Sequence, residues 1–119
     1  MPRPVLYTWN LTAARLKALR DLCAQMSVPV RPVAPQEAVK PLASLGETVP
    51  VPGLAAMPFA EEMLLMAYFP DKLIDRLLAG MKAKGIAVPR KAVLTPTNAG
   101  WNSIQLFAEL SREAARAQN

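Results

Sequence analysis

The sequence contains no histidine and a single cysteine, Cys23. Histidine is the commonest general acid or base and the commonest protein ligand of metal ions, so its absence disfavours most catalytic and metal-binding functions. A lone cysteine excludes an intrachain disulfide framework and is typical of a reducing compartment. We therefore expect a cytoplasmic protein without a metal or other cofactor, and we favour a function other than catalysis.

Long apolar runs and charged residues are also scarce. The longest apolar run covers the seven residues 63–69, far short of the roughly 20 residues that a membrane-spanning helix needs. No run of signal-peptide length follows the amino end. Charged residues make up 19% of the sequence, which suggests a surface partly covered by association. The net charge of +5 is compatible with nucleic acid or acidic partners.

The length of 119 residues fits a single domain over residues 1–119. Stretches rich in β-branched, aromatic or other apolar residues predict four strands, at 4–9, 28–33, 63–69 and 88–95. Apolar positions three and four residues apart predict helices at about 12–26 and 71–84, and a last helix that begins after Asn102. Prolines and a glycine predict a loop at about 46–60.

This order of elements predicts an α/β (α+β) sandwich with a ferredoxin-like βαββαβ core and an additional C-terminal helix. Prolines place the second and fourth strands at the sheet edges and leave the first and third in the centre, because proline cannot donate to a ladder. The third strand is apolar without alternation, so it needs cover on both faces. We expect the C-terminal helix and a partner subunit, in a homodimer, to supply the second cover.

Residues 91–102 read Lys-Ala-Val-Leu-Thr-Pro-Thr-Asn-Ala-Gly-Trp-Asn. This segment resembles the bacterial family called domain of unknown function 3783, which typically shows a lysine-alanine-valine, a threonine-proline-threonine-asparagine, a tryptophan and a helix with acidic residues. The match continues into the last helix at Leu106, Glu109, Leu110 and Glu113. It extends more weakly over the first half, so that it covers nearly the whole chain, and Pro70 departs from a common serine. The resemblance implies the expected fold but no activity, because the family is uncharacterised.

The loop between the last strand and the last helix is the most informative polar stretch. Thr95 precedes a proline and is pushed towards an extended conformation, so the strand ends there. The side chains of Thr97 and Asn98 are able to bond neighbouring backbone groups, and we favour this structural interpretation. Asn102 and Gln105 have the spacing of a capping box at the start of the next helix.

The same loop is a candidate site for a small anionic ligand. Amides near a helix start, hydroxyls and a nearby basic side chain are groups that hold a phosphate or a carboxylate. The sequence contains no glycine-rich phosphate motif, so the anion site is a hypothesis only. The candidate ligand-binding residues are Lys91, Thr95, Thr97, Asn98 and Trp101.

Two other functions stay open. Scattered basic residues suggest a nucleic-acid-binding accessory protein, but RNA-recognition modules of similar topology carry a basic-aromatic motif that is absent around Tyr68. A small enzyme acting through Thr95, Lys91 or Cys23 lacks a base. Cys23 also lies on the apolar stripe of the first helix, where a buried, inert thiol is expected. We therefore favour a small ligand- or partner-binding module, with or without a regulatory role.

Overall fold

The computed structural model of the protein describes residues 2–46 and 56–117. In chain order, the elements of the described residues are β1 (Val5–Trp9), α1 (Ala13–Ala24), β2 (Val30–Pro32), the 3₁₀ turns η1 (Pro35–Val39) and η2 (Leu42–Ser44), β3 (Met63–Ala67), α2 (Asp71–Ala83), β4 (Arg90–Val93) and α3 (Ser103–Ala117). Each expected strand and helix is confirmed, although the strands are shorter than expected. Of the expected proline-rich loop, residues 47–55 lie outside the described residues.

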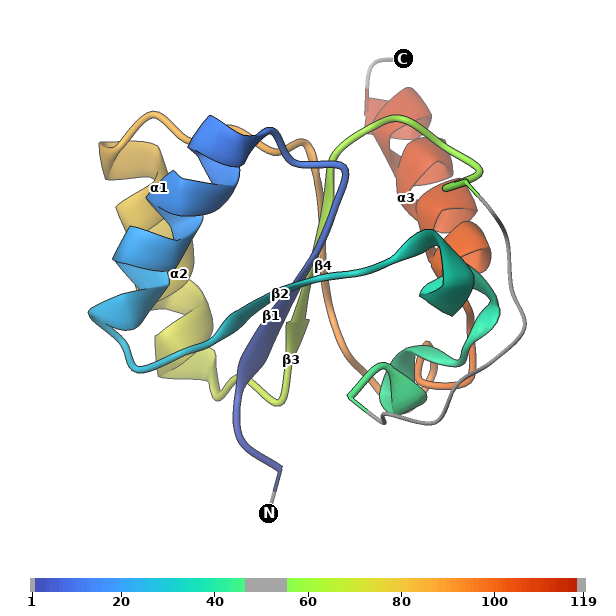
Figure 1. Ribbon diagram of the computed structural model, residues 1–119, viewed down its shortest axis with the longest axis horizontal. Coiled ribbons are helices and arrows are strands. Elements are labelled where there is room, and N and C mark those ends of the chain that lie inside the picture. Colours follow the sequence, from blue (N-terminus) through green and yellow to red (C-terminus); the bar gives the residue numbers. More distant parts are fainter. Residues whose placement is uncertain (1, 47–55, 118–119) are drawn as a thin grey trace.

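The four strands form one sheet in the order β2-β1-β3-β4. β1 is parallel to β2 and β3 is parallel to β4, whereas the central strands β1 and β3 are antiparallel. In Figure 1, α1 and α2 lie on one face of this sheet, and α3 and the 3₁₀ turns lie on the other. The expected α/β sandwich is therefore confirmed, together with its central and edge strands.

The strand pairing differs from the expected ferredoxin-like connection. A ferredoxin-like sheet splits each β-α-β unit, so that another strand lies between its two parallel strands. Here each unit is intact, because β2 lies directly beside β1 and β4 lies directly beside β3. The physical reason is the connection from β2 to β3, which is too long for a hairpin turn and whose 3₁₀ turns pack on the second face of the sheet.

Both faces of the central strands pack against other parts of the same chain. All five residues of β3 are buried. Leu64 and Met66 belong to the core under α1 and α2, whereas Leu65 belongs to the core under α3. Phe59 adds to this second cover by stacking on Phe107 of α3, with 4.2 Å between the ring centroids. The C-terminal helix thus provides the cover that we expected of it, and the homodimer stays a prediction.

The two β-α-β units repeat each other. β1 and β3 begin at Val5 and Met63, and α1 and α2 begin at Ala13 and Asp71, so both pairs of elements start 58 residues apart. Two right-handed units whose first strands are antiparallel neighbours are related by a two-fold axis perpendicular to the sheet. This relation explains why α1 and α2 lie on the same face (Figure 1).

The backbone conformation repeats at the same spacing. The residue after each first strand is left-handed, with φ of 61° at Asn10 and 62° at Tyr68. The residue that turns the chain after each helix is also left-handed, with φ of 57° at Ser27 and 69° at Gly85. A backbone hydrogen bond of 2.9 Å closes both helix ends at equivalent positions. The chain therefore contains two copies of one structural unit with different side chains.

The repeat predicts opposite effects of exchanging Ser27 and Gly85. A left-handed backbone costs a non-glycine residue about 1 kcal/mol, whereas glycine adopts it freely. We expect Ser27→Gly to raise the free energy of unfolding by about 1 kcal/mol and Gly85→Ser to lower it by a similar amount. Urea unfolding of both variants measures the change. A change of the same sign in both would contradict the equivalence of the two positions.

Candidate functional site

The side-chain amide of Asn98 forms hydrogen bonds with backbone groups at the outer edge of β4, as a peptide group of a neighbouring strand would. Its Oδ1 accepts a hydrogen bond from the N–H of Thr95 at 2.8 Å, and its Nδ2 donates to the carbonyl of Val93 at 3.0 Å. The N–H of Asn98 donates in turn to Oγ1 of Thr95 at 3.2 Å. Because Asn98 is 8% exposed, these bonds satisfy backbone groups that water does not readily reach. The structural interpretation of the loop is confirmed for Asn98.

The other candidate residues are spread over both sides of the sheet. Lys91 is exposed on the side of α2, where its ammonium donates to a backbone carbonyl at 2.6 Å. Thr97 is exposed and takes part in no hydrogen bond within the described residues. Trp101 is half-buried against the core under α3, and its carbonyl accepts an N–H of η2 at 2.7 Å. The structure thus brings Thr95 and Asn98 together but places Lys91 elsewhere.

The start of α3 holds the loop in place. The N–H of Asn102 donates to Oε1 of Gln105, and the N–H of Gln105 donates to Oδ1 of Asn102, both at 2.9 Å. This reciprocal pair is the expected capping box. Trp101 and Leu106, on either side of it, belong to the same core. The loop is therefore anchored at β4 by Asn98 and at α3 by Asn102.

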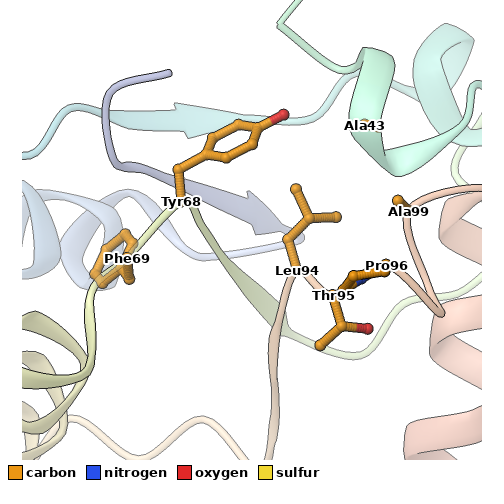
Figure 2. A pocket seen from close by; sticks show the side chains of 7 residues that line it. All are labelled: Ala43, Tyr68, Phe69, Leu94, Thr95, Pro96 and Ala99. Carbon is orange, nitrogen blue, oxygen red and sulfur yellow. The ribbon is translucent and has the colours of Figure 1, made fainter. Parts of the chain in front are cut away.

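A pocket of about 280 Å³ opens where β3 and β4 end. Parallel strands bring the residues that follow them to one edge of the sheet, which is the usual ligand-binding edge of α/β sheets. Figure 2 shows Tyr68 and Phe69, which follow β3, on one side of this pocket, and the residues that follow β4 on the other. We call it the Tyr68 pocket. It is lined by Ala43, Tyr68, Phe69, Leu94, Thr95, Pro96 and Ala99.

Tyr68 is the pocket residue that the sequence pattern concealed, because it stands in the apolar run predicted as one strand. It is 41% exposed, and its φ of 62° is strained for a bulky side chain. The equivalent Asn10 has a clear structural use, since its Nδ2 donates to the carbonyls of Phe59 and Glu61 at 2.8 and 2.9 Å. Alignment of the two halves at a spacing of 58 residues would have placed Tyr68 opposite Asn10 and so marked it as an unusual residue for a left-handed position.

The structure gives little support to catalysis by Cys23. Its side chain is buried in the core under α1 and α2, and this burial raises the pKa of the thiol to about 11. A thiol with so high a pKa is protonated and inert near neutral pH. Within residues 2–46 and 56–117, no three His, Cys, Asp or Glu side chains gather as metal ligands.

The sheet does not present an aromatic surface to a nucleic acid. Tyr7 and Trp9 of β1 are buried in the core under α3, and burial raises the pKa of the Tyr7 phenol against the opposing effect of Arg31. RNA-recognition modules instead stack bases on exposed aromatic residues of an open sheet face.

In the described part of the chain, no helix has the length and apolar character needed to cross a membrane.

The hydrogen bonds of Asn98 predict a contrast with Thr97, its neighbour in the loop. Asn98→Ala leaves the Thr95 N–H and the Val93 carbonyl without their partners, so we expect the free energy of unfolding to fall by about 2 kcal/mol. Thr97→Ala removes an exposed side chain and is expected to change it by less than about 0.5 kcal/mol. Thermal and urea unfolding measure both variants. An equal loss of unfolding free energy in both variants would show that the hydrogen bonds of Asn98 do not stabilise the loop.

The buried thiol predicts slow chemical modification. At pH 8 we expect Cys23 in the folded protein to react with a disulfide reagent roughly a hundredfold more slowly than in urea, because burial disfavours the thiolate. Absorbance of the released thiolate measures the rate. Above pH 8.5 the thiol of the unfolded chain ionises first, so this group lowers the stability of the fold as the pH rises towards about 11. Rapid modification of the folded protein would contradict the burial.

Comparison with known proteins finds a family match in the second half of the chain. No curated protein and no solved structure matches the chain. Residues 62–116 match a family model, and this segment contains β3, α2, β4 and most of α3. It includes the loop with Asn98 and all of the Tyr68 pocket except Ala43. The family that this segment matches is described as Domain of unknown function (DUF3783), and the match does not include the first β-α-β unit.

Proposed function

We propose that the protein is a non-enzymatic binding module that holds an apolar group, preferably an aromatic ring, of a small ligand or a partner in the Tyr68 pocket. The proposed site is therefore the Tyr68 pocket and not the turn around Thr97, where the sequence placed it. Thr95 is the one residue common to both.

The observation that carries the proposal is the backbone conformation of Tyr68. A left-handed conformation costs a bulky residue about 1 kcal/mol or more. Tyr68 recovers little of this cost, since it is 41% exposed and its hydroxyl has no hydrogen bond within the described residues. Asparagine is the residue that suits such a position, and the first half has Asn10 there. Strained residues of this kind concentrate at functional sites.

The lining of the pocket selects the kind of ligand. Tyr68, Phe69, Leu94 and Pro96 offer apolar and aromatic surface, and no charged side chain among the described residues lines the pocket. The hydroxyl of Thr95 is already engaged by the N–H of Asn98. The volume of about 280 Å³ lies below the range of about 300–1,000 Å³ for drug-sized ligands, and suits a single ring. An anion finds no matching charge here.

Three further observations support binding without catalysis. The Thr95 hydroxyl bonds its own loop, Lys91 lies on the α2 side of the sheet, and Cys23 is buried with a raised pKa. None of the side chains that we considered as nucleophiles is thus both free and at the pocket. The free thiol of Cys23 also suits the reducing cytoplasm, which we propose as the compartment.

An exchange between the two halves tests the part played by Tyr68. We expect Tyr68→Asn to raise the free energy of unfolding by about 1 kcal/mol, because strain is relieved, and to weaken the binding of phenol and indole. Asn10→Tyr at the equivalent position should lower the free energy of unfolding by about 2 kcal/mol, because two hydrogen bonds are lost. Urea unfolding and ¹H–¹⁵N NMR titration measure these effects.

Variants that fill the pocket provide the control. Ala99→Leu and Ala43→Leu place a larger side chain in the pocket and should abolish the amide shifts that indole produces at residues 68 and 94–99. Ile104→Ala removes an exposed apolar side chain outside the pocket and should leave them unchanged. Shifts located elsewhere, or retained in both filled variants, would overturn the proposal.

A further inference from the structure

The two edges of the sheet differ in how open they are to another strand. On β2, the N–H of Val33 and the carbonyl of Pro29 bond β1, so the alternation of a parallel ladder turns Pro32 outward. Proline has no N–H and therefore blocks pairing at that edge. On β4, the N–H of Leu94 bonds β3, so Lys91 and Val93 face outward. Within β4 no proline faces outward, and Pro89 lies just before the strand.

Asn98 closes only the end of the β4 edge. Its Nδ2 donates a hydrogen bond to the carbonyl of Val93, which is therefore not open to another strand. The N–H and the carbonyl of Lys91 and the N–H of Val93 face outward, and no strand among the described residues pairs with them. These three groups are sufficient for a short stretch of main-chain pairing with an extended segment.

A groove lies beside this open edge, between α2 and β4. It has a volume of about 380 Å³ and is lined by Leu78, Met81, Lys82, Ile86, Ala87 and Lys91. Its floor is apolar, and Leu78 is 37% exposed although it is a large aliphatic residue. Its charged members are two lysines. The Lys91 ammonium donates to one backbone carbonyl and has two further donors.

The first half of the chain lacks this combination. At the spacing of 58 residues, Arg20 stands in the place of Leu78 and Ala24 in the place of Lys82. The second half thus has an exposed leucine where the first half has an exposed arginine, and a lysine where the first half has an alanine. The second half therefore has an apolar floor with a positive rim next to the unblocked sheet edge.

We propose that the groove between α2 and β4 is a docking site for an extended acidic segment of a partner protein. An aliphatic side chain of this segment packs on Leu78 and Ile86, its carboxylates lie near Lys82 and Lys91, and its backbone pairs with the outer edge of β4. Charge complementarity selects this partner, because every charged residue of the groove is basic.

The same charges disfavour a second copy of the chain as the occupant. Antiparallel pairing of two β4 strands centred on Lys91 would place Lys91 of one copy directly opposite Lys91 of the other. Like charges directly opposite each other destabilise a strand pair. A partner with carboxylates at alternate positions meets no such repulsion.

Selection from random seven-residue peptides displayed on phage tests the proposal. We expect enriched peptides to combine acidic residues with an aliphatic residue, and their affinity to fall as salt is raised. Lys82→Glu with Lys91→Glu should weaken the best peptide about tenfold or more, measured by fluorescence polarisation. Leu78→Arg, which restores the residue of the first half, should also weaken it about tenfold despite its added positive charge.

Lys17→Glu with Arg20→Glu is the matched control, because it changes the net charge equally on the exposed side of α1. It should change the affinity less than about twofold. Circular dichroism of each variant verifies that it is folded. Failure to enrich any peptide, enrichment without acidic residues, or equal weakening by the control would overturn the proposal. A dimer that Lys91→Glu strengthens would also overturn it, since the edge would then serve a second copy.

Discussion

The antiparallel pairing of β1 with β3 is the contact on which the rest of the fold depends. It runs from Val5 opposite Ala67 to Trp9 opposite Met63 and joins the two β-α-β units, whose helices α1 and α2 also contact each other. Because both strands are central and largely buried, each face of the sheet needs an apolar cover. α1 and α2 cover the same face because both β-α-β crossovers have the same handedness. The other face is left to α3 and the 3₁₀ turns.

Local sequence patterns predicted the elements, since the forces that form them act over a few residues. The capping box of Asn102 and Gln105 was predictable because its partners are three residues apart. The unbroken apolar run from Met63 indicated a strand buried on both faces, and prolines indicated which strands are edges. The neighbours of each strand were not predictable in this way. They depend on how the connection between β2 and β3 packs, which no local pattern encodes.

The candidate site was predicted in part, for a related reason. The loop after β4 was recognised because proline, asparagine and glycine have strong local preferences. Asn98 has the expected structural role, although its partners on β4 were not predicted. Tyr68 was overlooked because its backbone conformation contradicts the preference of tyrosine, and only the surrounding fold imposes it. Lys91 was grouped with the loop by proximity in sequence, although the pleat turns its side chain towards α2.

The two-fold relation between the units gives the β1–β3 contact the geometry of an isologous interface, such as joins two identical subunits. In a symmetric dimer of one such unit, each substitution would appear at both ends of the sheet. Here the units share one chain, so a residue can change in one of them while its counterpart keeps its structural task. Asn10 binds the segment that leads into β3, while Tyr68 is free to face solvent. Covalent joining of the units thus permits one end of the sheet to specialise while the other preserves the fold.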